Sequence, residues 1–263
     1  MKSELKILTV IVLHHCRLSA SKAFRTLSAH PELDFFIHCN SKDSTIDSTC
    51  SAKVFKEYRD ETNPGVSAAY NRAFRWAELE KLGYDYFLLA DQDTDFSPGY
   101  LNEFYSARNR YPNSDMFFPK TMSGSKMISP AVFKLSRAWY APETPNFGDI
   151  DIKMLRPINT GLIVSRSLFE RTGGYNERVF LDYSDFEFVE RCIKIGAKAV
   201  FFDSVNQSEL SDHQNVDLGQ RLKRYILFLQ STAPLIFRST FLFLPIWWIL
   251  RFVKVVAGSI RAN

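Results

Sequence analysis

The stretch that decides the fold reads YDYFLLADQD and occupies residues 84–93. Its first seven residues are mostly apolar and predict a buried strand, after which Asp91, Gln92 and Asp93 follow without a break. Because open α/β sheets bind ligands beyond the carboxyl ends of their strands, we expect this tripeptide to face a binding crevice. Two carboxylates two residues apart can hold one Mg²⁺ or Mn²⁺, which keeps positions open for substrate phosphates. A solvated acidic turn is the alternative interpretation.

Strands and helices are expected to alternate on both sides of this stretch. Residues 5–13 are β-branched and apolar without alternation, which is typical of a strand buried on both faces of a sheet. The alternation over residues 5–95 predicts the α/β class with a doubly wound half. Residues 120–156 form a mixed stretch with several Pro and Gly. We expect strands at 5–13, 33–39, 53–58, 84–90, 115–119, 158–164 and 197–203, and helices at 19–29, 66–77, 98–111, 167–172 and 185–195.

Composition excludes several classes of protein. The chain has 263 residues, of which 46% are hydrophobic, so it can bury a large core and is not disordered. A net charge of +4 is too small to indicate a nucleic-acid partner. The four cysteines are scattered, which argues against a disulfide framework or a structural zinc site and favours a cytosolic compartment. The sequence contains none of the glycine motifs GxGxxG, GxxxxGK[ST] and GxSxG.

A second acidic cluster lies in FLDYSDFEFVER, at residues 180–191. Aromatic residues separate Asp182, Asp185 and Glu187, so we expect some of these carboxylates to be half-buried. Burial and like-charged neighbours raise the pKa of a carboxylate and can make it a usable general base. The alternative is a helix N-terminus with favourable acidic residues. His213 lies in a polar loop, and its imidazole can complete a metal's coordination if the chain folds back.

Several segments, taken in order, resemble the family-2 glycosyltransferases with the GT-A fold, and most closely their bacterial rhamnosyltransferase-like branch. The resemblance covers residues 5 to about 215. It implies a doubly wound mixed sheet flanked by helices. The matching segments after the first strand are NPGVSAAYNRA at 63–73, YFLLADQD at 86–93, INTGLIVSRSLFERTGGYNE at 158–177 and FLDYSDFEFVER at 180–191.

The resemblance also implies roles for single residues. Asp91 and Asp93 would lie at the metal and the diphosphate, with Asp93 as the direct ligand, and His213 would match the family's late metal-proximal histidine. Asp185 would be the catalytic base that deprotonates an acceptor hydroxyl. The residues near the nucleotide or its diphosphate would be Asn40, Asp43, Asn63, Gly65, Asn71, Asp91 and Gln92.

Two positions depart from the family pattern. Ser184 precedes Asp185, where many relatives have a glutamate at the corresponding position. The second strand ends in Cys39-Asn40 instead of Asp-Asn, so the aspartate that would contact the nucleobase is missing at this point. Asp43 is a possible substitute for that missing aspartate.

The predicted function is therefore an inverting, metal-dependent hexosyl transfer, with rhamnose as one possible sugar. The donor would be a dTDP- or UDP-sugar, and the acceptor a lipid-linked bacterial surface glycan of the O-antigen (lipopolysaccharide) or capsule type. One alternative is a nucleotidyltransferase, which should carry a Gly- and Arg/Lys-rich loop after the first strand, whereas residues 14–22 read HHCRLSASK. Another is a non-catalytic relative that binds nucleotide sugars, against which the retained Asp93 and Asp185 argue.

The C-terminal segment, residues 217–263, has its own character and is predicted to follow a catalytic domain at residues 1–216. Residues 241–250 are all apolar, but Pro245 interrupts a run too short for the roughly 20 residues that a membrane span needs. We therefore expect a peripheral protein on the cytoplasmic face of the inner membrane, held by aromatic and basic groups at anionic lipid. A helix packed on the catalytic domain or in a homo-oligomer is the alternative. The segment has one acidic residue, Asp217, and seven basic ones: Arg221, Lys223, Arg224, Arg238, Arg251, Lys254 and Arg261.

Overall fold

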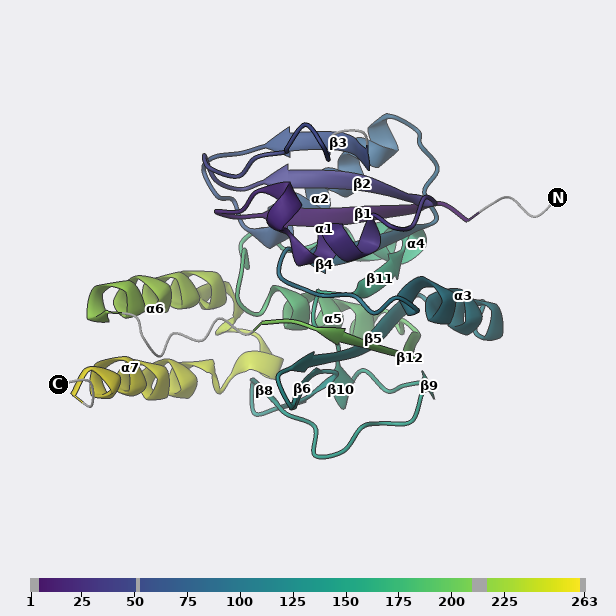
Figure 1. The fold of residues 1–263 in the computed structure, drawn as a ribbon. Coiled ribbons are helices and arrows are strands. Elements are labelled where there is room, and N and C mark those ends of the chain that lie inside the picture. Colours follow the sequence, from purple (N-terminus) through teal and green to yellow (C-terminus); the bar gives the residue numbers. More distant parts are fainter. Residues whose placement is uncertain (1–4, 51–52, 210–216, 261–263) are drawn as a thin grey trace.

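A computed structural model of the chain describes residues 5–50, 53–209 and 217–260. Its centre is a nine-stranded sheet with the order β3-β2-β1-β4-β11-β5-β12-β9, in which β6 pairs with β5, and a second sheet has the order β10-β7-β8 (Figure 1). The strands are β1 (Ile7–Leu13), β2 (Leu33–Cys39), β3 (Val54–Arg59), β4 (Tyr86–Asp91), β5 (Met116–Ser123), β6 (Lys126–Ser129), β7 (Ala131–Lys134), β8 (Arg137–Trp139), β9 (Gly148–Asp149), β10 (Leu155–Arg156), β11 (Leu162–Ser165) and β12 (Ala199–Gln207). The α-helices are α1 (Lys22–Leu27), α2 (Val66–Leu79), α3 (Tyr100–Arg110), α4 (Arg166–Thr172), α5 (Ser184–Lys194), α6 (Leu218–Thr232) and α7 (Leu244–Ile260).

The sheet is mixed, and the parallel part brings the ends of four strands to one edge. Strands β3, β2, β1 and β4 run parallel to one another, whereas β11 is antiparallel to both β4 and β5. Strand β12 is parallel to β5. The carboxyl ends of β1, β2 and β4 therefore meet at the edge where a doubly wound sheet binds its ligands.

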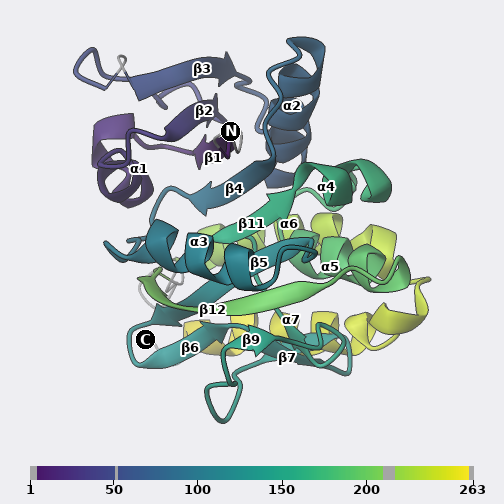
Figure 2. The same ribbon diagram turned by 90° about the vertical axis from the view of Figure 1, so that its right-hand side faces the viewer.

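Helices cover both faces of the sheet, as Figure 2 shows for α1 and α2 on opposite sides of β1 and β4. The side chains of β1 divide between the two layers because neighbouring residues of a strand point to opposite faces. Leu8, Val10 and Val12 belong to a core that includes residues of α2, α4 and α5. Ile7, Ile11 and Leu13 belong to a core that includes residues of α1 and α3. Burial on both faces explains why the sequence of β1 shows no alternation.

The α/β class, the mixed sheet and the flanking helices confirm the expected fold, and the differences are local. The helix expected at 19–29 is a 3₁₀ turn at Leu18–Ala20 followed by α1, which Ser21 caps by accepting a hydrogen bond from Phe24 N. The strand expected at 158–164 begins only at Leu162, and the preceding Asn159 and Thr160 make side-chain hydrogen bonds at the site described below. Within residues 120–156 lie β6 to β10, including the second sheet.

The C-terminal segment is helical, and its middle part packs into the fold. Leu235, Phe241 and Leu244 are buried against Val179 and Phe186, close to the start of α5. Helix α6 precedes this anchor and α7 follows it, and the two helices project side by side from one end of the molecule (Figure 1). Most of the large apolar side chains of α7 are exposed.

Two expectations about α7 need correction. Pro245 does not interrupt the helix, since it lies in the first turn, where its missing N–H has no partner to lose. The apolar segment also does not end at Arg251, because the helix continues and the guanidinium folds over the ring of Phe228 at 4.1 Å. Residues Ser239–Ala257 have a mean hydropathy of 1.7, and by length and composition alone they are sufficient to cross a membrane.

Candidate active site

The acidic tripeptide lies where the sequence predicts it, at the end of β4. Strand pairing sets Asp91 beside Val12 of β1. Its backbone N–H donates to Thr160 Oγ1 at 3.1 Å, which ties the tripeptide to the turn before β11. The side chain of Gln92 accepts from His14 N at 2.8 Å and donates to His14 O at 3.0 Å. Gln92 therefore locks the ends of β1 and β4 together, so its side-chain amide is used inside the protein.

The electrostatics of the tripeptide suit a cation. Burial and the charge of Asp93 together raise the pKa of Asp91 to about 7, although a hydrogen bond from Tyr70 Oη at 3.5 Å opposes the rise. Burial also raises the pKa of Asp93, with Glu209 adding to the rise and Lys22 opposing it. The two carboxylates thus repel each other in partly buried positions. A divalent ion would relieve this repulsion, and oxygen ligands are those that Mg²⁺ and Mn²⁺ prefer.

The third predicted metal ligand, His213, lies outside the described residues. Within 5–50, 53–209 and 217–260, no group of three or more His, Cys, Asp or Glu side chains has the arrangement of a metal site. Asp91 and Asp93 fit a metal that takes its remaining ligands from phosphates and water.

In the second acidic cluster, the structure separates Asp185 from its two neighbours. Asp182 forms a two-pronged ion pair with Arg224, at 2.5 and 2.7 Å. Glu187 is fully buried and pairs with Arg191 at 2.9 Å and with Arg238 at 2.6 Å. Asp185 takes part in no ion pair within the described part of the chain, and its Oδ1 accepts only the adjacent Phe186 N–H at 2.8 Å. Of the three carboxylates, it is the one that remains available to accept a proton.

The two acidic motifs meet in space. Burial and the negative charges of Asp91 and Asp182 together raise the pKa of Asp185 to about 7, against the opposing hydrogen bond from Phe186 N. Both Asp91 and Asp185 also raise the pKa of the buried hydroxyls of Tyr70 and Tyr175, so the two phenols lie within electrostatic reach of both carboxylates. An unpaired carboxylate with a pKa near neutrality beside a paired-acid motif is the arrangement expected of a general base near a metal.

The pKa of Asp185 predicts a pH dependence. Only the carboxylate form accepts a proton, so kcat/KM should rise tenfold per pH unit below about pH 7 and level off above it. Besides Asp91 and Asp182, the charged groups near Asp185 include Arg137, which lines the same cavity, and Arg156, which pairs with Glu190 at 2.9 Å. Initial rates measured at a saturating metal concentration between pH 5.5 and 8.5 test this expectation. A flat profile in that range contradicts it.

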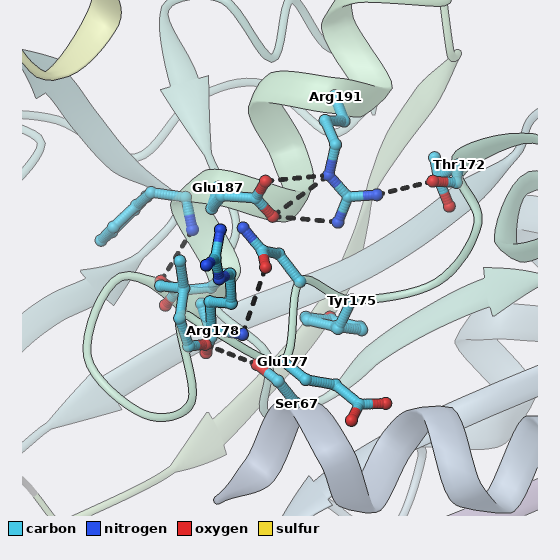
Figure 3. Close-up of polar contacts among 12 residues, drawn as sticks. Ser67, Thr172, Tyr175, Glu177, Arg178, Glu187 and Arg191 are labelled. Carbon is cyan, nitrogen blue, oxygen red and sulfur yellow. Dashed lines mark hydrogen bonds and ion pairs between the residues drawn. The ribbon is translucent and has the colours of Figure 1, made fainter. Parts of the chain in front are cut away.

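Residues 173–183 form the loop that precedes the base, and α2 holds this loop in place. The amide of Asn71 donates to Tyr175 O at 2.8 Å and to Glu177 Oε1 at 2.9 Å, and it accepts from Tyr175 N at 2.7 Å. Ser67 Oγ donates to Val179 O at 2.7 Å. Figure 3 shows Ser67, Tyr175 and Glu177 in this arrangement. The side chain of Asn71, which the resemblance places near the nucleotide, positions the loop in the structure.

Gly65 has the same kind of role at the start of α2. Its φ is +88°, and a Cβ atom there would lie 2.2 Å from Phe180 O. Only glycine allows the first turn of α2 to approach the loop so closely, and Val66 N then donates to Phe180 O at 2.9 Å. The sequence resemblance links Gly65 to the nucleotide, whereas in the structure it contacts the loop that precedes Asp185.

Glu187 joins the same loop to two other segments. Figure 3 shows Arg191 between Glu187 and the carbonyl oxygen of Thr172, to which it donates at 2.6 Å. Arg238 reaches Glu187 from the C-terminal segment, 51 residues along the chain. The carboxylate therefore fastens α5, the start of the loop and the C-terminal segment at one point.

This arrangement predicts a large effect of Glu187→Ala on stability. Removal of one partner from a buried ion pair leaves an uncompensated charge, and the free energy of unfolding should fall by about 3–5 kcal/mol. Urea unfolding with an unchanged m-value measures it. The matched control is Glu170→Ala, which removes an exposed i,i+4 pair with Arg166 and should cost less than about 1 kcal/mol. Equal effects of the two substitutions would show that Glu187 does not have this role.

The remaining residues predicted to bind the nucleotide lie after the end of β2 and before the start of α2. Asn40 follows β2, is 3% exposed, and its Oδ1 has no hydrogen-bond partner among the described residues. Asp43 is exposed, accepts from Ser41 Oγ at 2.8 Å and pairs with His15 Nδ1 at 2.8 Å. Asn63 has a φ of +53° in the turn before α2. Asn40 and Asp43 thus lie at the ligand-binding edge of the sheet, and a buried amide oxygen without a partner suits a bound donor group.

A cavity of about 280 Å³ opens on Asp185 and Phe186. Its other walls include Ile128, Trp139 and Tyr140, and the two aromatic rings are about half exposed. Aromatic faces beside a carboxylate provide a surface on which a sugar ring can stack while one of its hydroxyls reaches the base.

The sequence reasoning missed several residues of the site. Asn159 donates to Ser184 Oγ at 3.1 Å and accepts from Tyr175 Oη at 2.7 Å, which links the turn before β11 to the start of α5. Thr160 bonds both Asp91 N and Thr94 Oγ1. Their signal was the INTG segment at 158–161, whose polar residues interrupt an otherwise apolar strand pattern.

Comparisons with known proteins identify the class of fold. Neither a protein-family model nor a curated protein matches the chain. A solved structure of residues 1–349 of S. aureus TarS with UDP-GlcNAc has 12% identity and a TM-score of 0.56, over 86% of this chain and 67% of that one. For a longer S. aureus TarS structure the values are 13% and 0.55, and the match covers 86% of this chain but only 40% of that one. The mannosyltransferase PcManGT from Pyrobaculum calidifontis, with GDP-Man and Mn²⁺, has 12% identity and a TM-score of 0.57 over 100% of this chain and 77% of that one. At such identities the likeness establishes the architecture, and the chain has the GT-A glycosyltransferase fold.

Proposed function

We propose that the protein is a metal-dependent, inverting glycosyltransferase that moves a hexose or deoxyhexose from a nucleotide diphosphate sugar to a glycan acceptor. One observation carries the proposal: Asp185 is an unpaired carboxylate with a raised pKa, in electrostatic contact with the acidic pair that ends β4. The GT-A fold supports it, since the solved relatives include structures with UDP-GlcNAc and with GDP-Man.

In the proposed mechanism the acceptor hydroxyl lies against Asp185 in the cavity lined by Trp139 and Tyr140. Asp185 takes the hydroxyl proton as the acceptor oxygen bonds to the anomeric carbon from the face opposite the diphosphate. The bond from that carbon to the diphosphate breaks, so the configuration inverts without a covalent enzyme intermediate. Tyr70 holds the Asp91 carboxylate in place, and Thr160 holds its backbone.

Asp91 and Asp93 would hold Mg²⁺ or Mn²⁺, with His213 as a proposed further ligand. The metal supplies charge stabilisation for the departing diphosphate, which is worth several kcal/mol. Glu209 lies four residues before His213, acts electrostatically on Asp93 and pairs with Lys22. The chain therefore passes close to the proposed metal ligand Asp93 just before the segment that contains His213.

The proposed donor is a dTDP- or UDP-sugar. The resemblance to the rhamnosyltransferase-like branch makes rhamnose the proposed sugar. Asn40, Asp43 and Asn63 would contact the nucleotide at the strand ends. The proposed acceptor is a growing lipid-linked surface glycan of the O-antigen or capsule type.

We also propose that the protein lies on the cytoplasmic face of the inner membrane, with residues 217–263 as its membrane-associating segment. Exposed apolar residues of α7 include Ile249 at 65% and Val253 at 54%. The Trp247 indole donates to Leu135 O at 2.6 Å, which holds the helix against the folded domain and favours a peripheral position. Arg224 and Arg238 pair with acidic residues of that domain, so fewer basic groups face lipid than the sequence count implies. A homo-oligomer that covers the same apolar face is the alternative.

A panel of nucleotide sugars tests the function. Ligands that bind the native state raise the melting temperature, so UDP-, dTDP- and GDP-sugars are compared with and without Mn²⁺. Sugars that stabilise the protein are then assayed for transfer and for slow hydrolysis. A metal-dependent shift with release of nucleoside diphosphate supports the proposal. Binding without turnover indicates a non-catalytic relative, and release of pyrophosphate from a nucleoside triphosphate indicates a nucleotidyltransferase.

A further inference from the structure

A second cavity lies between α7, α6 and β8, and Tyr183 also lines it. Its volume is about 260 Å³. Three of its lining residues are basic, and the rest are aromatic or apolar. The basic residues are Arg137, Arg251 and Lys254, and the aromatic ones include Tyr183 and Trp247.

The three basic groups have no carboxylate partner among the ion pairs of the described residues. Arg137 lies between two indoles, at 4.7 Å from the ring of Trp139 and 4.6 Å from that of Trp247. Arg251 is partly buried against Phe228, and burial lowers the pKa of its guanidinium. The nearby Asp182 is already bound by Arg224. Arg137 and Arg251 are partly buried cations without a carboxylate partner, and Lys254 is exposed beside them, so the cavity favours an anionic group.

The cavity borders the proposed acceptor site. Arg137 lines both this cavity and the one that opens on Asp185. Tyr183, which lines the basic cavity, lies two residues before Asp185, has a φ of +66°, and donates from its hydroxyl to Ser136 O at 2.9 Å. A single molecule can therefore have a sugar at the base and a negative group among the three basic residues.

The outer wall of the cavity is apolar and faces away from the domain. Leu250 lines the cavity and is 45% exposed, and next to it on α7 lie the exposed side chains of Ile246 and Val253. An anionic group held here would have apolar helix surface on one side and the acceptor cavity on the other. This order matches a sugar, a phosphate and a hydrocarbon chain joined in sequence.

We propose that this basic cavity binds the phosphate or diphosphate group that joins an acceptor sugar to a hydrocarbon chain, with the chain lying along α7. The proposal rests on the proposed function and assigns the acceptor's anchor to specific residues. It makes the acceptor for this site a sugar close to its lipid phosphate, because the two cavities share a wall.

Binding of short probes tests the cavity independently of turnover. Geranyl diphosphate, geraniol and inorganic pyrophosphate are titrated into the full chain by calorimetry, in EDTA, so that no metal recruits the diphosphate to Asp91 and Asp93. Geranyl diphosphate is expected to bind at least about tenfold more tightly than either other probe. Equal binding of pyrophosphate would show a free-anion site, and equal binding of geraniol a purely apolar one, and either result overturns the proposal.

Single substitutions then locate the probe. Lys254→Gln removes an exposed cation without disturbing packing and should weaken geranyl diphosphate binding at least about tenfold, as should Arg251→Gln. The matched control is Lys223→Gln, an exposed residue of α6 that does not line the cavity, which should bind the probe as the wild type does. Unchanged binding by Lys254→Gln overturns the proposal even if Arg251→Gln fails to fold.

The two proposals can fail separately. Asp185→Asn should bind geranyl diphosphate normally, since the basic cavity does not depend on the base. If nucleotide sugars do not bind but geranyl diphosphate does, the glycosyltransferase proposal fails and the anion site stands. If transfer to a soluble glycan proceeds and geranyl diphosphate does not bind, the basic cavity is not the acceptor anchor.

Discussion

Asp185→Asn is expected to lower kcat by about 10²–10⁴-fold while leaving donor affinity nearly unchanged. The amide keeps the size of the side chain and can still accept the hydrogen bond from Phe186 N, but it cannot take a proton at neutral pH. The loss of a proton acceptor affects the chemical step and not the binding of the nucleotide. Steady-state kinetics together with donor titration measure both quantities, and the rise of the rate below pH 7 should disappear.

The neighbouring carboxylates provide the controls for this substitution. Asp182→Asn weakens the ion pair with Arg224 and should reduce stability more than kcat under conditions where the variant is folded. If Asp182→Asn abolishes turnover in a folded protein while Asp185→Asn does not, the base is misassigned. Loss of donor binding in Asp185→Asn would instead indicate that this residue has a binding role.

Asp93→Ala should reduce transfer at least about 10³-fold with the fold intact. The side chain is partly exposed at a strand end, takes part in no ion pair of the described residues and contributes little to packing. Its loss removes a proposed metal ligand, so the negative charge on the departing diphosphate is left unstabilised. Excess EDTA should reproduce the loss in the wild type, and added Mn²⁺ should reverse it.

Asp95→Ala is the matched control, because Asp95 is an exposed carboxylate in the same turn whose backbone pairs with Gln207. Its activity should remain within a few-fold of the wild type. Full activity of the wild type in excess EDTA would remove the metal from the mechanism, although the fold would stand. Unfolding of Asp93→Ala, seen in circular dichroism, would show that the carboxylate is structural.

Much of the fold follows from local patterns. The unbroken apolar run of β1 predicts burial on both faces, and its residues do divide between two cores. The position of Asp91 after a buried strand predicts the edge of the sheet at which it lies. These features depend on the identity of adjacent residues, and the periodicity of strands and helices makes them readable from the sequence.

Other features depend on residues that are distant in the sequence. The amide of Asn71 binds Tyr175, 104 residues later, so its role in holding the loop is visible only after folding. In the same way, a Cβ atom at Gly65 would meet Phe180, which only the packing of α2 on the loop reveals. The sequence assigns both residues to the nucleotide because their spacing matches a motif, whereas the structure shows the contacts that they make.

The choice of base shows where the division lies. By itself the sequence determines that three carboxylates occur near the start of one helix among aromatic residues, and that some of them are partly buried. The tertiary structure decides which one is available, since Asp182 is neutralised by Arg224 and Glu187 by Arg191 and Arg238. Two of these partners are 42 and 51 residues away in the chain. The pKa of a carboxylate depends on the charges and solvent around it in space. Only the folded chain therefore leaves Asp185 without an ion-pair partner and with a pKa near 7.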